Sequence, residues 1–587
     1  MKTRLAGFVL ALAMAAAPGA AIAQQAADAV APEIASGTKA REAVAASRRM
    51  VAAANPLAAE AGLAVLRAGG TAADALVAVQ TVLGLVEPQS SGIGGGAFLV
   101  WYDAASGTVT TFDGRETAPE AATETLFLTP DGTPMGFFEA VVGGRSVGVP
   151  GVVRLMETVH GRYGRKDWAG LFEPAATLAE QGFAVSPRLE ALIADDADRL
   201  AGQASTRAYF LHEDGAPLKA GDRLANPAYA RTLRQIGRQG ADAFYEGAIA
   251  EAIVAAVTGH GDNPGALSRA DLAAYRAKER APVCVSYRGH EVCGMGPPSS
   301  GALAIGQILG LLEGFNLPAL GPEAPESWRL IGDATRLAFA DRGRYVADSD
   351  FTRIPEGLLD RAYLAARAAL LRRPTALPAS DVAPGEPPWK KAALRLDGVT
   401  PEMPSTSHFV IVDDDGNIAS MTSSIENAFG ARLMVEGFLL NNQLTDFSFA
   451  PRRAVAAVAN RPQGGKRPRS SMSPTIVLRD GRPLYALGSP GGSNIIAYVA
   501  KTLVALIDWE MDMQEAVALP HLTNRFGTYH IEAGTAAEEL AGPLEALGYT
   551  VEIRALNSGL HGIAFNEDGT LVGGADPRRE GEVVAVP

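Results

Sequence analysis

Pro404-Ser405-Thr406-Ser407-His408-Phe409-Val410-Ile411-Val412-Asp413 is the stretch around which the rest of this sequence is organised. Residues 409–412 form an unbroken apolar run rich in β-branched side chains, which is typical of a strand buried on both faces. Residues 413–417 are dense in turn-forming types, and 418–422 resume an extended pattern. We therefore predict a β-hairpin with Thr406 at the mouth of its first strand. A threonine in that position is usually only a good strand former.

Five motifs follow in order from Thr406: Thr406-Ser407-His408-Phe409, Asp415-Gly416-Asn417, Asn441-Asn442-Gln443-Leu444-Thr445-Asp446-Phe447, Arg469-Ser470-Ser471-Met472-Ser473-Pro474 and Gly488-Ser489-Pro490-Gly491-Gly492-Ser493. Together they resemble the small subunit of the γ-glutamyltransferases (γ-glutamyl transpeptidases), a family of N-terminal-nucleophile hydrolases. Further matches extend the resemblance from about Val51 to the C-terminus. It implies an α+β fold, the four-layer αββα sandwich of that class, built from both halves of one self-cleaving precursor.

The resemblance places a self-cleavage site between Ser405 and Thr406. Residues 24–405 would then be the large subunit and 406–587 the small subunit, associated as a heterodimer in one interleaved domain. A hydroxyl is a poor nucleophile and needs a base within hydrogen-bond distance. Cleavage would supply that base as the α-amine of Thr406, because an α-amine has an ordinary pKa of about 7.7–8.0. Thr406 would therefore carry nucleophile and base together.

Residues 1–23 are typical of a secretory signal peptide. Lys2 and Arg4 form its charged end, an apolar run follows, and Ala21-Ile22-Ala23 is a small-residue cleavage site. The apolar run is short for a membrane span of about 20 residues, although an uncleaved anchor is the alternative. We expect a periplasmic or secreted protein with no membrane association after signal removal.

The composition is that of a globular enzyme, with 47% hydrophobic and 20% charged residues. Without Lys2 and Arg4 the chain has 50 basic and 65 acidic residues, a net charge of −15. This balance argues against a nucleic-acid partner and is compatible with a small-molecule substrate. The resemblance implies no metal and no cofactor.

Arg115 follows a predicted strand at residues 108–112. Most arginines are solvated surface charges, and Arg115 alone would be assigned that role. In the family this position grips the α-carboxylate of the substrate, and a guanidinium suits a two-point contact with a carboxylate. The resemblance gives Ser470 and Ser471 the same task, and we consider Glu116 only as an orienting partner for Arg115.

The resemblance assigns the other substrate contacts to the predicted small subunit. Ser424 falls where the family has a second hydroxyl near the nucleophile, able to orient Thr406. Glu426 stands where many members have asparagine and other bacterial members glutamate. With Gln443 and Asp446 it would receive the α-ammonium of the substrate.

A glycine-rich turn at 489–493 separates a predicted strand from a predicted helix. Its spacing differs from the Gly-x-Gly-x-x-Gly pattern of dinucleotide sites, so no cofactor follows from it. The backbone N–H groups of Gly491 and Gly492, at the start of the helix, would instead stabilise an oxyanion.

The two cysteines lie in a predicted hairpin, with strands at 283–287 and 290–294. If Arg288-Gly289 is the turn, Cys284 stands opposite Cys293 at a non-hydrogen-bonded pair, where side chains approach most closely. In an exported protein this pattern favours a disulfide over free thiols, and two ligands are too few for a typical metal site.

Residues 448–466 depart from the family pattern. Some members have a longer loop here, with a tyrosine that closes over the substrate. This segment has no tyrosine and is basic, so any lid is shorter or built differently. The balance between hydrolysis and transfer stays open.

The sequence thus predicts a self-processing γ-glutamyltransferase that cleaves γ-glutamyl amides such as glutathione. Thr406 would form the acyl-enzyme, and water, an amino acid or a peptide would resolve it. The nearest alternative is a glutaryl or cephalosporin acylase on the same scaffold. A catalytically inactive binding protein is a third interpretation, but it would not need Thr406.

Overall fold

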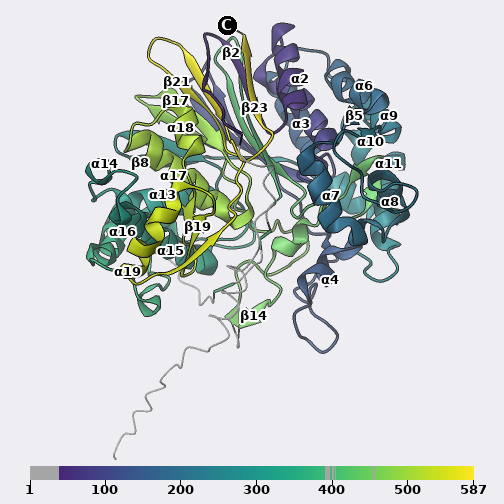
Figure 1. Cartoon of the computed structure of the whole chain (residues 1–587). Helices are drawn as coiled ribbons and strands as arrows, with labels where there is room; N and C mark the ends of the chain where they lie inside the picture. The colour runs from purple at the N-terminus through teal and green to yellow at the C-terminus, as the bar shows by residue number, and fades with distance from the viewer. Residues whose placement is uncertain (1–38, 390–396, 399–401, 404, 454–455, 587) are drawn as a thin grey trace, which may run out of the picture.

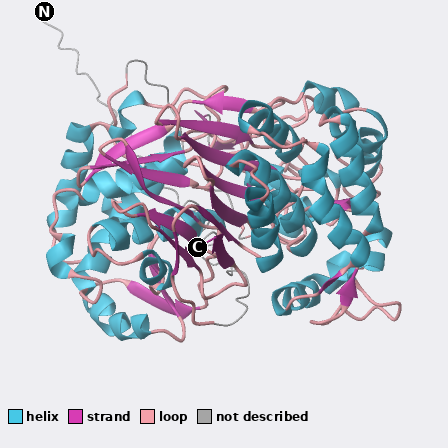
Figure 2. Cartoon of the chain, turned by 90° about the horizontal axis from the view of Figure 1, so that it is seen from above, coloured by secondary structure: helices cyan, strands magenta, loops and turns pink. Residues whose placement is uncertain are grey.

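Two seven-stranded antiparallel sheets form the centre of the molecule (Figures 1 and 2). The computed structural model describes residues 39–389, 397–398, 402–403, 405–453 and 456–586. The first sheet runs in the order β23 (Glu582–Val586), β2 (Arg49–Ala53), β10 (Ser407–Val412), β11 (Ile418–Ser424), β3 (Gly96–Asp103), β4 (Thr108–Gly114) and β7 (Lys278–Arg280). The second runs β1 (Val44–Ala46), β22 (Leu571–Ala575), β21 (His561–Phe565), β17 (Arg482–Gly488), β16 (Thr475–Arg479), β9 (His290–Gly294) and β8 (Val283–Tyr287).

Helices cover the outer face of each sheet. The first sheet is covered directly by α2 (Pro56–Arg67), α3 (Ala72–Val86) and α5 (Val152–Tyr163). On the same side of the molecule lie α4 (Phe137–Val141), α6 (Glu173–Gln181), α7 (Pro187–Leu200), α8 (Ala204–Phe210), α9 (Pro227–Gln239), α10 (Asp242–Tyr245), α11 (Gly247–Thr258) and α12 (Arg269–Ala274). The second sheet is covered directly by α13 (Gly301–Leu312), α17 (Ile495–Ile507) and α18 (Met513–Ala518), and beyond them lie α14 (Leu317–Leu320), α15 (Pro325–Tyr345), α16 (Arg361–Ala368) and α19 (Ala541–Ala546).

Small sheets lie outside these layers. Three are two-stranded: β5 (Phe183–Ala184) with β6 (Arg223–Leu224), β12 (Met434–Val435) with β13 (Phe438–Leu439), and β14 (Arg452–Arg453) with β15 (Ala456–Ala457). A three-stranded sheet combines β18 (Leu522–Thr523), β19 (Thr528–Glu532) and β20 (Thr550–Arg554).

Three apolar cores hold the four layers together. One lies between the sheets, where Val410 and Val412 of β10 pack with Ile476 of β16 and Ile563 of β21. The alternate residues of β10 face the opposite way, into the core formed with α2, α3 and α5. The third core joins the second sheet to α13, α15 and α17. This arrangement is the predicted αββα sandwich.

The hairpin predicted from the sequence occupies the middle of the first sheet. β10 pairs with β11 in a register that sets Phe409 opposite Met421, and every residue of both strands is buried. β10 also pairs with β2, and β11 pairs with β3. Since β2 and β3 precede Thr406 in the chain, both halves of the sequence build this sheet.

Local sequence signals fix the first two helices, which pack on the hairpin. Asn55 caps α2 by accepting the Leu57 N–H, and Pro56 occupies the first helical position. Thr71 and Asp74 form a capping box at the start of α3. The Asp413 carboxylate then accepts the Ala72 N–H at 2.9 Å, which links the hairpin turn to the helix.

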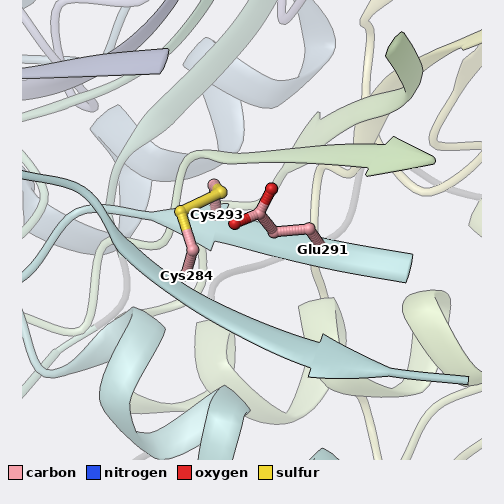
Figure 3. Close-up of side chains that lie close together, drawn as sticks. All are labelled: Cys284, Glu291 and Cys293. Carbon is pink, nitrogen blue, oxygen red and sulfur yellow. A yellow bond between two sulfur atoms is a disulfide. The ribbon is translucent and has the colours of Figure 1, made fainter. Parts of the chain in front are cut away.

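Cys284 and Cys293 face each other across β8 and β9, in the register expected from the sequence, and their sulfur atoms are bonded (Figure 3). The Cα atoms are 4.1 Å apart. Glu291 lies beside them, and the three side chains form a cluster of metal-ligand types. A cysteine binds a metal ion as its thiolate. The two sulfur atoms are bonded to each other here, so neither is available as a thiolate ligand.

We expect this bridge in protein isolated from an oxidising compartment, and trypsin offers a sharp test. Arg288 lies in the hairpin turn, so cleavage after it separates the peptide 281–288 from 289–329. Mass spectrometry of an unreduced digest should find these two peptides linked, and reduction before digestion should separate them. Cys284→Ser is the matched control. Two alkylatable thiols in native material would contradict the prediction.

In the described part of the chain, no helix is both long and apolar enough to cross a membrane. The predicted signal peptide, residues 1–23, lies outside the described residues.

Candidate active site

Thr406 lies at the mouth of β10, where the sequence predicted it, and its side chain is buried. Its Oγ1 donates to the Ser424 Oγ at 3.2 Å. Its backbone carbonyl accepts from the Arg579 guanidinium at 3.2 Å. Because Thr406 and Ser424 lie at neighbouring ends of β10 and β11, the hairpin register itself brings the two hydroxyls together.

Ser424 also contacts the peptide bond that precedes Thr406. Its Oγ donates to the Ser405 carbonyl oxygen at 2.9 Å and accepts the Glu426 N–H at 2.8 Å. The Ser405 hydroxyl donates to the Gln89 carbonyl at 2.6 Å, and Ser405 is fully buried. The Ser405–Thr406 peptide is thus held on both sides, with its carbonyl oxygen polarised by a hydroxyl donor.

Nearly all the residues with a predicted role line one small cavity beside Thr406. Its volume is about 20 Å³, which is room for about one water molecule. Gly491 and Ser405, of the residues predicted for catalysis, substrate binding and cleavage, are not part of the lining. The lining residues are Arg115, Glu402, Met403, Thr406, Ser424, Glu426, Gln443, Asp446, Ser470, Ser471, Met472, Gly492 and Ile495.

Arg115 and Asp446 are paired with each other. The Arg115 Nη2 lies 2.5 Å from the Asp446 Oδ2, and the same nitrogen donates to the Arg469 carbonyl at 3.0 Å. Gln443 donates to the same Asp446 oxygen at 2.8 Å. Glu116 is more distant, with 3.8 Å between its Oε2 and the Arg115 Nη1. The residue predicted to bind the substrate carboxylate and the residue predicted to bind its ammonium are therefore in direct contact.

Glu426 follows β11 in a left-handed conformation, with φ of 79°. This backbone turns its side chain towards Asn442, which donates to the Glu426 Oε2 at 2.5 Å. The other carboxylate oxygen accepts the Met403 N–H at 3.1 Å. Burial, and then repulsion by Asp446, raise the pKa of Glu426 well above its ordinary value.

Burial also raises the pKa of Asp446 to about 6, although the Arg115 guanidinium opposes this shift. A carboxyl with a raised pKa is neutral below that pKa and charged above it. The capacity of this site to hold a cation is therefore present above about pH 6 and is lost as the pH falls.

We expect donor binding to follow this titration. If Asp446 receives the ammonium of an amino-acid donor, kcat/KM should fall by up to about tenfold for each pH unit below about 6. A pH profile of kcat/KM for a γ-glutamyl anilide measures this. Asp446→Asn should remove the additional fall below about pH 6, while retaining the dependence that comes from protonation of the Thr406 amine. A flat wild-type profile below pH 6 would contradict the assignment.

Three charged residues near the cavity received no role from the sequence. Glu402, four residues before Thr406, accepts hydrogen bonds from Arg342 of α15 and from Ser471. Its Oε1 lies 3.7 Å from the Arg469 Nε. Arg469 begins the motif Arg469–Pro474, in which the family resemblance gives a role to Ser470 and Ser471. Arg342 lies in the long helix α15, and the sequence around it does not indicate that its side chain reaches the neighbourhood of the cavity.

The glycine-rich turn reaches the same cavity. Gly491 and Gly492 have φ values of 132° and 56°, and the short 3₁₀ helix Gly492–Asn494 leads directly into α17. A Cβ on Gly492 would lie 2.9 Å from the Glu402 carbonyl oxygen. A side chain at this position would therefore collide with the segment that precedes Thr406.

Within the segment 448–466, β14 pairs with β15, and none of the described residues of this segment line the cavity. The Ser448 N–H donates to the Asn460 carbonyl at 2.9 Å, which closes the base of the hairpin. Arg452 forms an exposed pair with Glu124, at 3.0 Å between Nε and Oε1.

Two sheets between helical layers, with a threonine at the mouth of a central strand, define a fold of the N-terminal-nucleophile hydrolase type. The family model described as gamma-glutamyltranspeptidase matches residues 58–586, and the chain belongs to this family.

Relatives and solved structures carry two kinds of name. A glutathione hydrolase proenzyme of Bacillus subtilis is 35% identical over 92% of this chain and 91% of its own length. Acylase ACY 1 proenzyme of a Pseudomonas species is also 35% identical, over 94% and 96% of the two lengths. A cephalosporin acylase from Bacillus halodurans superposes with a TM-score of 0.80 at 26% identity, covering 94% of this chain and 98% of that one. A Helicobacter pylori gamma-glutamyltranspeptidase chain gives 0.55 at 36% identity, covering 60% and 97%.

Proposed function

We propose that this protein is a self-processing γ-glutamyltransferase in which Thr406 is the nucleophile. The observation that carries the proposal is the hydroxyl chain at the Ser405–Thr406 peptide. The Thr406 Oγ1 donates to Ser424, and Ser424 donates to the Ser405 carbonyl oxygen at 2.9 Å. A nucleophile and a carbonyl-polarising donor thus lie at the bond that the sequence marks for cleavage.

Self-cleavage proceeds in two steps. The Thr406 oxygen attacks the Ser405 carbonyl carbon, the C–N bond breaks, and an ester forms while the Thr406 nitrogen takes up the hydroxyl proton. Water then hydrolyses the ester, which leaves a carboxylate on Ser405 and a free α-amine and hydroxyl on Thr406. The Ser424 hydroxyl stabilises the developing oxyanion in the first step.

Turnover repeats this chemistry on a donor. The α-amine of Thr406 accepts the proton of the Thr406 hydroxyl, and the hydroxyl oxygen attacks the γ-carbonyl carbon of the donor. The C–N bond of the donor amide then breaks, and the α-amine passes the proton to the departing amine of the donor. Backbone N–H groups of Gly491 and Gly492 stabilise the oxyanion. Water then releases glutamate, or an amino acid or peptide takes the acyl group. No step requires a metal or a cofactor.

Charge complementarity supports a γ-glutamyl donor such as glutathione. Arg115, Ser470 and Ser471 bind the α-carboxylate, while the α-ammonium meets Glu426, Gln443 and Asp446. The acidic pair is the sharper argument. Arg115 already pairs with Asp446, so one neighbouring cation serves two buried carboxyl groups, and the donor ammonium would supply a second.

A glutaryl or cephalosporin acylase is the second candidate, and the equal identity to an acylase proenzyme favours keeping it. A glutaryl donor has the same acyl chain but lacks both charged α-groups. It would bring no ammonium to Glu426 and Asp446, which would keep only their contacts within the protein.

The proposal includes the subunits and the location. Residues 24–405 and 406–587 form the large and small subunits of a heterodimer, exported to the periplasm or beyond after removal of residues 1–23. The proposed partner is a small-molecule substrate, and the proposed reaction involves neither a nucleic acid nor a membrane.

Steady-state kinetics with a γ-glutamyl anilide test the activity directly. We expect release of the aniline, and a higher rate when a dipeptide acceptor is added if transfer competes with hydrolysis. A glutaryl anilide is the matched donor without α-groups. Failure to release aniline from the γ-glutamyl donor, by protein fully cut before Thr406, would refute the proposed activity.

A further inference from the structure

The carboxylate of Glu402 fills a positively charged recess beside the cavity. It accepts from the Nη2 of Arg342 and from the hydroxyl of Ser471, and it lies 3.7 Å from the Arg469 Nε. Arg342 Nη2 also donates to the Ser471 hydroxyl at 2.7 Å. Arg342, Arg469 and Ser471 are all at least 95% buried. All three lie outside the segment that carries Glu402.

This recess contains more positive than negative charge. Arg342 and Arg469 share the carboxylate of Glu402, and Asp446, which pairs with Arg115, also attracts Arg469. Burial, then repulsion by Arg342, lower the pKa of Arg469 to about 9. If Glu402 left and only apolar contacts replaced it, two buried guanidinium groups would lose their shared counter-ion. That loss is strongly unfavourable. The recess therefore requires an anion whether or not Glu402 occupies it.

The segment around Glu402 presents the polar groups of an amino acid. Its carboxylate meets the arginines and Ser471, while the next N–H, of Met403, donates to the Glu426 Oε1 at 3.1 Å. A γ-glutamyl donor also carries a carboxylate and an N–H donor, but both are attached to its α-carbon, whereas four carbon atoms separate them in Glu402 and Met403. Glu402 and Met403 both line the cavity and reduce it to about 20 Å³, which leaves no space for such a donor.

We propose that Arg342, Arg469 and Ser471 form a carboxylate-binding subsite, which Glu402 fills in the uncut chain and the donor α-carboxylate fills after cleavage. The second half of this statement rests on the proposed function. Once the Ser405–Thr406 bond opens, Glu402 lies three residues from a free chain end and can withdraw. Arg115, which also contacts Asp446, remains the first cation for the donor carboxylate, and Arg342 supplies a second.

The uncut chain allows a test that needs no activity. Acetate is the fragment that Glu402→Ala removes, so it should fill the vacated recess. The melting temperature of Thr406→Ala/Glu402→Ala should be lower than that of Thr406→Ala, and it should rise with sodium acetate concentration. Acetamide, and sodium chloride at the same ionic strength, should not restore it. An equal response to acetate and chloride would overturn the proposal.

Asp397 provides the matched control for this test. It lies in the same part of the chain, but its carboxylate pairs with Arg344 at 2.8 Å in a partly exposed position. Thr406→Ala/Asp397→Ala should show no specific response to acetate. If acetate stabilises this variant as much as the Glu402→Ala variant, the effect is general and the subsite does not exist.

The cut enzyme tests the donor contact. Two γ-glutamyl anilides are compared, one with a free α-carboxylate and one with an α-carboxamide. Arg342→Gln should lower kcat/KM for the carboxylate donor by about 10²-fold, and the charge-retaining Arg342→Lys by less. The carboxamide donor should change by less than about threefold in both variants. Equal losses on the two donors would overturn the donor assignment.

Arg344→Gln is the matched control on the same helix, and it should leave both donors unaffected. The two possible failures are distinguishable. If wild-type protein cleaves neither anilide, the proposed function fails, while the acetate response of the uncut chain still decides whether the subsite exists. If wild-type protein is active and Arg342→Gln does not separate the donors, the donor contact fails alone.

Discussion

Thr406→Ala should yield a single uncut chain of about 61.0 kDa, or slightly less after signal removal, with no measurable turnover. We expect kcat to fall by at least about 10⁴-fold, because both the nucleophile and the route to its free α-amine are lost. Gel electrophoresis follows cleavage, N-terminal sequencing locates it, and anilide release measures activity. Wild-type protein should give two fragments, the smaller beginning at Thr406.

Two further variants test whether the loss of activity in Thr406→Ala comes from the missing Thr406 hydroxyl. Thr406→Ser keeps the hydroxyl and the amine, so it should still cut itself and turn over, though more slowly. Ser407→Ala removes the adjacent hydroxyl, which hydrogen-bonds to Ser91 at 3.1 Å, and should behave like wild type. A fully active but uncut wild-type preparation would refute the mechanism.

Wild-type protein should strongly prefer a γ-glutamyl anilide to a glutaryl anilide. Sites built around a polar group can reject an analogue without it by about 10⁴–10⁵-fold. We discount this figure to about 10²–10³-fold here, because water that enters the pocket would hydrate polar groups that a glutaryl donor leaves unpaired. Asp446→Asn should remove most of this preference, because it lowers kcat/KM for the γ-glutamyl donor and leaves the glutaryl donor almost unchanged.

Asp414→Asn is the matched control for this experiment. Asp414 lies in the turn between β10 and β11, pairs with Arg49 of β2, and has no predicted role in the cavity. The Asp414→Asn variant should therefore keep the full preference for the γ-glutamyl donor. If wild-type protein uses both donors equally and Asp446→Asn affects them equally, the ammonium site is wrongly assigned. The acylase interpretation would then replace the proposed one.

The parts of the structure that could be predicted from the sequence are those with local causes. The β10–β11 hairpin follows from an apolar run and a turn, and the capping box of α3 follows from Thr71 and Asp74. The register of Cys284 and Cys293 follows from a two-residue turn. The grouping of Arg115 with Asp446 came from family resemblance, since no local rule joins residues so far apart.

The parts that could not be predicted depend on long-range contacts between ordinary residues. Arg342 is one of several arginines in α15, and 60 positions separate it from Glu402. Glu402 itself reads as a solvated acid in a loop. Only the fold shows that both point into the same recess. The direct pairing of Arg115 with Asp446, which were predicted to bind opposite ends of the substrate, was equally invisible.

Both central sheets combine strands from before and after Thr406, and this affects the stability of the protein after cleavage. β10 and β11 lie between β2 and β3, so the two fragments could not separate without breaking the sheet. The uncut chain folds in a unimolecular reaction, whereas the cut fragments would have to find each other again after denaturation. Refolding yield should therefore depend on concentration only after cleavage. Before cleavage, the free energy of unfolding would keep the protein folded. After cleavage, a slow rate of unfolding would maintain the folded state instead.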